Sequence, residues 1–364
     1  MSYESERIRR MRGYTAGEQP LDATTIKLNT NENPYPPSPR VAAALAGFDV
    51  ATLRRYPQPT ADALRDRIAA RLRITREQIL VTNGGDELLR LAFTTFLDPG
   101  DAFGTTDVSY SLYPVLAEIQ GCSVATVELT NDWRLPSDFA ARLNASGARL
   151  CCIVNPHAPS GTLATCESLA AIARDFRGVL LIDEAYADFV DPELRYDGVE
   201  LVRAFDNVLL LRTFSKGYSL AGLRVGFAVG HAELIAPMLG KTRDSYNVDA
   251  LSQALACAAF DDLPYAADTW AKVRSERARL ADALRSRGFT VPPSQSNFVL
   301  AQMPSAAALD AEALAAQLKR DGVLVRHFSQ DRLRDKLRIT IGDRDQNARL
   351  LAAIDRALGC VTPR

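Results

Sequence analysis

The residue with the clearest chemical potential is Lys216, which follows an apolar run from Val208 to Leu211. A short apolar run of this kind is typical of a buried strand, and open α/β sheets bind ligands at the carboxyl ends of their strands. Most lysines are solvated surface charges, whereas a lysine whose pKa is lowered by its surroundings acts as a Schiff-base nucleophile. Taken alone, Lys216 leaves both interpretations open.

Arg224 lies eight residues beyond Lys216 and carries a forked cation that suits a phosphate group. Gly222 precedes it and allows the backbone to approach a ligand closely. The spacing from Gly217 to Gly222 superficially resembles a P-loop, but Leu223 and Arg224 stand where a lysine and a hydroxyl residue are required. We therefore exclude a P-loop here.

A second anion site is indicated where the apolar run Ile79–Thr82 meets Gly84, Gly85 and Asp86, just before an expected helix. Glycines between a strand and a helix leave backbone N–H groups free to bind an anion. Asp86 is also a suitable N-cap for that helix, so the turn has a purely structural interpretation as well.

Asp183 comes directly after the apolar run Val179–Ile182. A carboxylate at the end of a buried strand is costly unless it is paired, so the sequence predicts a cationic partner for it. Asp183 and Lys216 are 33 residues apart, a separation that a βαβ crossover accommodates. Both side chains are thus expected at one edge of one sheet.

Other polar side chains are expected near the same edge. Asn155 opens a proline-rich loop that is held rigid, with its amide directed into the cleft. Tyr110 lies at a strand-to-helix turn and is either an ordinary half-buried tyrosine or a ring that stacks on a planar ligand. Arg338 lies in an alternating strand, where an inward arginine needs an anionic ligand, whereas Arg326 fits a surface position equally well.

Composition restricts the class of protein. The chain has 364 residues, 47% of them hydrophobic, and a formal net charge of -1, so nothing indicates a nucleic-acid or membrane-surface partner. No apolar stretch reaches the roughly 18 residues of a membrane helix, and the polar N-terminus is unlike a secretory signal. The cysteines and histidines lack metal-ligand spacing, so we expect no metal and a cytoplasmic location.

Alternating strand and helix patterns run from residue 79 to residue 216. Repeated βα units predict an α/β fold whose mostly parallel sheet is covered by helices on both faces. The sequence beyond residue 262 instead mixes a long charged helix with shorter strands. We expect an N-terminal arm (1–34), a large domain (35–262) and a small α+β domain (263–364).

Together these groups suit pyridoxal 5'-phosphate. A lysine amine can form an imine with this cofactor, a carboxylate can keep its pyridine nitrogen protonated, and a helix start with an arginine can hold its phosphate. The predicted large domain is therefore expected to bind the cofactor.

The chain resembles the fold-type I, aspartate aminotransferase-like, pyridoxal-phosphate enzymes, and among them the histidinol-phosphate aminotransferase family. The segments that carry the resemblance are 28–39, 83–87, 155–161, 183–186 and 213–226, and the likeness continues through 246–248, 296–298, 325–326 and 337–342. Departures include Pro36, His157-Ala158, Ser160 and Asp244-Ser245, and none removes an expected cofactor contact.

The resemblance implies a role for each cofactor-site residue. Lys216 would carry the cofactor and act as the base, and Asp183 would pair with the pyridine nitrogen. Asn155 and Tyr186 would bind the ring hydroxyl, and Tyr110 would stack on the ring; the catalytic set is Lys216, Asp183 and Tyr186. The residues implied at the phosphate are Gly85, Asp86, Ser215, Arg224 and, from a second subunit, Tyr56.

The resemblance also implies the reaction. Tyr14, Asn33, Arg326 and Arg338 would bind the substrate, and a homodimer would transfer the amino group of L-histidinol phosphate to 2-oxoglutarate. The alternatives are an aromatic amino acid aminotransferase and, in third place, a decarboxylase of a phosphorylated amino acid.

Overall fold

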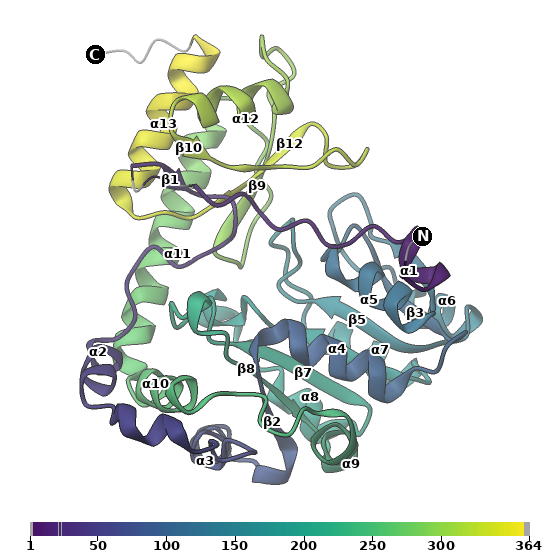
Figure 1. Cartoon of the computed structure of the whole chain (residues 1–364). Helices are drawn as coiled ribbons and strands as arrows, with labels where there is room; N and C mark the ends of the chain where they lie inside the picture. Colours follow the sequence, from purple (N-terminus) through teal and green to yellow (C-terminus); the bar gives the residue numbers. More distant parts are fainter. Residues whose placement is uncertain (1–2, 21, 23, 360–364) are drawn as a thin grey trace.

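The computed structural model describes residues 3–20, 22 and 24–359. One part of the molecule is built on a seven-stranded sheet and the other on a three-stranded sheet, and helix α11 (Leu263–Arg285) extends between them along one side (Figure 1). The predicted boundaries at residues 34 and 262 stay a prediction.

The large sheet is mostly parallel, as predicted. Its strands, in the order in which they lie side by side, are β2 (Ile79–Thr82), β8 (Gly226–Gly230), β7 (Val208–Thr213), β6 (Val179–Asp183), β5 (Ala148–Val154), β3 (Ala102–Asp107) and β4 (Ser123–Glu128). Only β8 runs against its neighbours, pairing antiparallel with both β2 and β7. The parallel strands therefore direct their carboxyl ends to one edge.

Helices cover both faces of this sheet. Along β7, Leu210 packs into one hydrophobic core and Leu209 into another, because successive side chains of a strand point to opposite faces. One face is covered by α3 (Asp62–Leu72), α6 (Phe139–Ala145), α7 (Cys166–Asp175), α8 (Val199–Ala204) and α10 (Ala250–Phe260). The other is covered by α4 (Gly84–Phe96), α5 (Leu112–Gln120) and α9 (Ala232–Pro237). The result is the predicted three-layer α/β arrangement.

The smaller sheet is antiparallel, with β12 (Lys336–Thr340) between β11 (Arg326–His327) and β9 (Phe298–Gln302). It shares a core with α11, α12 (Ala311–Arg320) and α13 (Arg344–Leu358). This confirms the α+β character expected for the C-terminal part.

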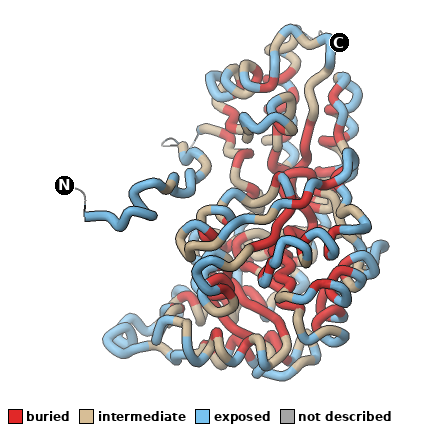
Figure 2. Tube along the Cα trace, turned by 90° about the vertical axis from the view of Figure 1, so that its right-hand side faces the viewer, coloured by how far each residue is buried: buried red, intermediate tan, exposed pale blue. Residues whose placement is uncertain are grey.

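The N-terminal segment joins both parts. After α1 (Glu6–Arg10) the chain crosses to the smaller part, where β1 (Ile26–Lys27) pairs in parallel with β10 (Val323–Leu324), and it then returns to α2 (Pro39–Ala46) beside the large part (Figure 1). Figure 2 shows this segment as mostly exposed from residue 3 to residue 16, whereas the strands inside the molecule are buried.

Within the described ranges, no helix has the length and apolarity needed to cross a membrane. The same residues contain no group of three or more histidine, cysteine, aspartate or glutamate side chains placed to hold a metal ion.

Candidate active site

A cavity of about 540 Å³ lies at the carboxyl ends of β3, β6 and β7, between the two parts of the molecule. The predicted site residues that line it are Tyr14, Gly85, Asp86, Tyr110, Asp183, Tyr186, Ser215, Lys216, Arg224, Arg326 and Arg338. Side chains from distant parts of the sequence thus meet in one pocket. This pocket lies at the carboxyl ends of the strands, as predicted.

Lys216 is a half-buried amine that lines this pocket. Its Nζ donates a hydrogen bond to the Thr30 carbonyl oxygen at 2.9 Å. Burial, with the positive charge of Arg338 nearby, lowers the pKa of Lys216 to about 8. A substantial fraction of the amine is therefore neutral near pH 8, and a neutral amine is the form that reacts with carbonyl compounds.

Asp183 ends β6 and is only 6% exposed. Its Oδ2 accepts a hydrogen bond from the Tyr113 hydroxyl at 2.9 Å, and its Oδ1 accepts one from the Ala185 N–H at 3.1 Å. Burial raises the pKa of Asp183 to about 6 despite these two donors. No lysine, arginine or histidine of the described chain forms an ion pair with it, so the predicted cationic partner has to be supplied by a ligand.

The start of α4 forms a cradle for an anion. Gly84 has a φ of +75°, and a Cβ there would lie 2.5 Å from Arg224 Nη2, so the guanidinium packs directly over this turn. Arg224 Nη1 also donates to Ser215 Oγ at 3.3 Å, and Nη2 lies 3.3 Å from Asp86. A helix N-terminus, a hydroxyl and an arginine together are well suited to a phosphate group.

Tyr14 and Tyr110 line the cavity, and the fully buried Tyr113 packs against Tyr110. The Tyr110 ring lies edge-on to Tyr113 at 5.6 Å between centroids and to Tyr14 at 5.8 Å. Its hydroxyl donates to Asp86 Oδ1 at 3.3 Å, and burial raises its pKa well above the ordinary value. Tyr110 is therefore held as a neutral ring beside Asp86 in the α4 turn.

Two arginines approach the cavity from the smaller sheet. Arg326 and Arg338 are directly opposite each other in the β11–β12 pair. Arg338 donates to the Asn29 carbonyl at 2.8 Å, but its Nε is buried without a partner in the described chain. Like charges opposite each other on paired strands are destabilising, so an anionic ligand would stabilise this pair.

Three predicted residues do not line this cavity. The Asn155 side-chain amide donates to the Ala164 carbonyl and accepts from the Ala164 N–H. It lines a neighbouring cavity instead. The Asn33 amide donates to the Gly217 carbonyl and to Thr269 Oγ1, both at 3.4 Å, and so ties loops together. Tyr56 is 80% exposed on the surface and stacks on Tyr246, with ring centroids 4.4 Å apart.

Three residues of the site were not predicted from the sequence, namely Thr30, Asn31 and Tyr113. Thr30 and Asn31 line the cavity and contact Lys216 and Tyr186, respectively. Tyr113 holds Asp183. Tyr113 had a usable signal, because it lies one helical turn after Tyr110 and so can face the same direction.

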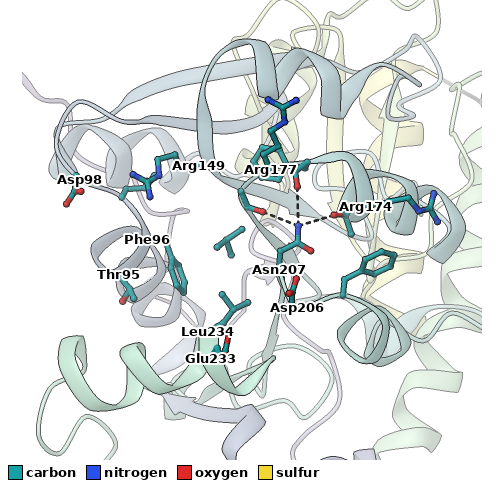
Figure 3. A pocket seen from close by; sticks show the side chains of 16 residues that line it. Thr95, Phe96, Asp98, Arg149, Arg174, Arg177, Asp206, Asn207, Glu233 and Leu234 are labelled. Carbon is teal, nitrogen blue, oxygen red and sulfur yellow. Dashed lines mark hydrogen bonds between the residues drawn. The ribbon is translucent and has the colours of Figure 1, made fainter.

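A second depression, of about 870 Å³, lies at the opposite edge of the sheet, where β5 and β6 begin (Figure 3). Its rim has three arginines, Arg149, Arg174 and Arg177, and three carboxylates, Asp98, Asp206 and Glu233. The charges balance, and the Asn207 amide is tied to three backbone carbonyls. Strand polarity therefore favours the cavity around Lys216 as the active site.

The cavity around Lys216 fits pyridoxal 5'-phosphate. Among the described residues no cation pairs with the buried Asp183, which could therefore pair with a protonated ring nitrogen, and the α4 cradle is suited to the phosphate. Lys216 would supply the amine to which the cofactor attaches. These three features lie in one pocket, which is the arrangement that the sequence predicted.

Comparisons with known proteins agree with this geometry. Residues 23–354 match the family described as aminotransferase class I and II. Histidinol-phosphate aminotransferase 1 from a Nostoc species is 40% identical over 354 residues, which cover 97% of each chain.

Solved structures resemble the whole chain. The histidinol-phosphate aminotransferase of Sinorhizobium meliloti, in complex with pyridoxal-5'-phosphate, superimposes with a TM-score of 0.89 at 23% identity, covering 100% of this chain and 99% of that chain. A mutant aspartate aminotransferase of Thermus thermophilus gives a TM-score of 0.81 at 22% identity, with coverage of 98% and 100%. These likenesses confirm the predicted fold class, fold-type I.

Proposed function

Because the chain belongs to the class I and II aminotransferases and, within them, to the histidinol-phosphate aminotransferases, we propose that it transfers the amino group of L-histidinol phosphate to 2-oxoglutarate. The products are imidazole acetol phosphate and L-glutamate. The observation that carries the chemistry is a half-buried amine, Lys216, in one pocket with a buried carboxylate, Asp183, that has no cationic partner in the described part of the chain. The choice of substrate is supported by the 40% identity to a relative of that name.

The cofactor of this enzyme is pyridoxal 5'-phosphate. When bound, it supplies an aldehyde carbon that takes up the amino group and a pyridine ring that withdraws electrons from the reacting carbon. Asp183 would keep the ring nitrogen protonated. Ser215, Arg224 and the backbone N–H groups at Gly85 and Asp86 would hold the phosphate.

In this proposal Lys216 moves the proton. Its pKa of about 8 lies close to the working pH, which suits a group that must accept a proton from the substrate Cα and later release it. Tyr110 would cover the ring and exclude water. Tyr186 would donate to the ring hydroxyl, and the predicted contribution of Asn155 there stays a prediction.

Arg326 and Arg338 would bind the anionic end of each substrate, with Tyr14 beside them. Histidinol phosphate ends in a phosphate group and 2-oxoglutarate in carboxylates, so both offer an anion to a pair of guanidinium groups. The buried, unpartnered Nε of Arg338 supports this role. The predicted contact of Asn33 with substrate also stays a prediction.

The substrate assignment is tested by single-turnover kinetics of the loaded enzyme with different amino donors. We expect histidinol phosphate to react at least about 10²-fold faster than phenylalanine, because only the former offers a phosphate to the two arginines. Absorbance changes of the cofactor follow each half-reaction. A faster reaction with phenylalanine would instead identify an aromatic amino acid aminotransferase, and carbon dioxide release without a keto acid would identify a decarboxylase.

We also propose a homodimer with active sites completed across its interface. Tyr56 is highly exposed and stacked on Tyr246, and Val50 and Leu53 nearby are exposed apolar side chains. Such a surface is typical of an interface between protein chains. In this arrangement Tyr56 would reach the phosphate cradle of the partner subunit. The expected cytoplasmic location stays a prediction.

Mixed dimers test whether Tyr56 acts across the interface. We expect Tyr56→Ala and Lys216→Ala each to lower activity at limiting cofactor. Their mixture, unfolded and refolded together, should regain about one quarter of the wild-type activity, because half of the dimers then contain one intact site. No recovery on mixing would show that Tyr56 serves its own subunit or has no role in the site.

A further inference from the structure

Asn31 is a buried residue of the N-terminal segment whose hydrogen-bonding groups all have partners, and it is 1% exposed. Its N–H donates to Thr340 Oγ1 at 3.0 Å, and its Oδ1 accepts from the same hydroxyl at 3.1 Å. Its Nδ2 donates to the Tyr186 hydroxyl oxygen at 3.0 Å, and its carbonyl accepts from Asn297 Nδ2 at 2.9 Å. Such a residue has one orientation only.

The contacts fix the direction of each hydrogen bond. A backbone N–H can only donate, so Thr340 Oγ1 accepts from Asn31 and directs its own proton to Asn31 Oδ1. The amide NH2 of Asn31 must then face Tyr186. Because an amide nitrogen does not accept hydrogen bonds, the Tyr186 oxygen is the acceptor and its proton is left for another group.

That proton has no protein acceptor in the described part of the chain, and Tyr186 lines the cavity around Lys216. The phenol is therefore prepared to donate to a ligand atom inside the pocket. Burial also raises the pKa of Tyr186, which keeps the phenol protonated. A ligand oxygen that carries negative charge is the best acceptor for such a donor.

The backbone of Asn31 contributes to the same arrangement. Its φ is +58°, in the left-handed region that asparagine tolerates better than most residues. The two preceding carbonyls, of Asn29 and Thr30, accept hydrogen bonds from Arg338 and Lys216. Asn31 thus locks in place the segment that contacts both of these cations.

We propose that Asn31 is a positioning residue for the aminotransferase reaction: together with Thr340 it directs the Tyr186 hydroxyl so that it donates to the anionic ring oxygen of the cofactor. This inference rests on the proposed function, because that function supplies the acceptor. Asn31 acts on the ring oxygen through Tyr186.

The test is the pH titration of the absorbance of the cofactor-loaded protein. In Asn31→Asp the side chain keeps its shape but becomes an acceptor, so Tyr186 turns its proton toward residue 31 and away from the pocket. A hydrogen bond from Tyr186 to the ring oxygen stabilises the deprotonated form of the bound cofactor over its protonated form. Losing that bond should raise the pH midpoint by about one unit, as Tyr186→Phe should also do.

A double-mutant cycle separates the effect of turning the Tyr186 proton from the effect of the negative charge that Asn31→Asp adds. If Asn31 acts through Tyr186, Asn31→Asp should cause no further shift in a Tyr186→Phe background. A shift that persists in that background, or no shift in Asn31→Asp alone, would overturn the inference. Should Asn31→Asp not fold, Thr340→Val frees the Asn31 amide to turn, and its smaller upward shift must likewise vanish in the Tyr186→Phe background.

The same experiment separates failure of this inference from failure of the proposed function. A wild-type protein that gains no cofactor absorbance band on addition of pyridoxal 5'-phosphate would overturn both. A wild-type band that titrates, together with an unshifted Asn31→Asp, would overturn only the role of Asn31.

Discussion

Replacing Lys216 by alanine is expected to lower transamination at least about 10⁴-fold, the largest effect of any single substitution in this chain. The variant loses both the amine that attaches the cofactor and the base that moves the substrate proton, and each role is worth several powers of ten. Single-turnover kinetics with histidinol phosphate measure the loss. A variant that retained more than a few per cent of wild-type activity would contradict the role assigned to Lys216.

Stability and a matched lysine serve as controls for this variant. Burial lowers the pKa of Lys216 to about 8, so the charged amine costs stability at pH 7 and removing it should not unfold the cofactor-free protein. Lys272 lies on the exposed side of α11 in a surface pair with Asp268. Lys272→Ala should keep full activity, because exposed ion pairs contribute little.

Replacing Asp183 by asparagine is expected to lower activity about 10³-fold, because a buried charge pair with the ring nitrogen is worth several kcal/mol. Asparagine fits the site, since its oxygen can accept from the Ala185 N–H while its NH2 group faces the Tyr113 hydroxyl oxygen. Cofactor binding should persist. Wild-type rates in Asp183→Asn would contradict the proposed pairing.

The same substitution should stabilise the cofactor-free protein at pH 8. Burial raises the pKa of Asp183 to about 6 from 3.8, so the ionised carboxylate costs about 3 kcal/mol at pH values above 6. This cost declines as the pH falls from 6 toward 4, because the folded protein then takes up the proton. The melting temperature of Asp183→Asn should therefore exceed that of wild type at pH 8, with the difference shrinking toward pH 4. A lower melting temperature of Asp183→Asn at pH 8 would show that burial of the ionised carboxylate does not destabilise the wild-type protein.

The large sheet was predictable because each of its parallel strands is identified by residues that are neighbours in the sequence. Apolar runs such as Val208–Leu211 and Val179–Ile182 identify buried strands, and the residues that follow them lie at one edge by geometry. Strand β8 was not recognised, because Gly226 and Gly230 at its ends make it look like part of the loop after Lys216. Its antiparallel direction follows from its pairing with β7, which sequence patterns do not encode.

The choice between Asn31 and Asn33 was not predictable. Both belong to the same asparagine-rich loop, yet Asn31 lines the cavity while Asn33 ties loops together. The difference depends on the left-handed backbone at Asn31 and on Thr340, which lies 309 residues away in the sequence. Contacts between residues so far apart in the sequence produce no local periodic pattern.

The pairing of the N-terminal segment with the C-terminal part has a consequence for synthesis of the chain. A ribosome releases residues 26–31 first, but their partners at β10 and β12 emerge only near the end of translation. The large sheet has all its strands once residue 230 has left the ribosome, whereas the segment that carries the Thr30 carbonyl beside Lys216 pairs with β10 and with Thr340 of β12. Folding of the large sheet can therefore precede completion of the pocket, which needs residues 323–340 as well.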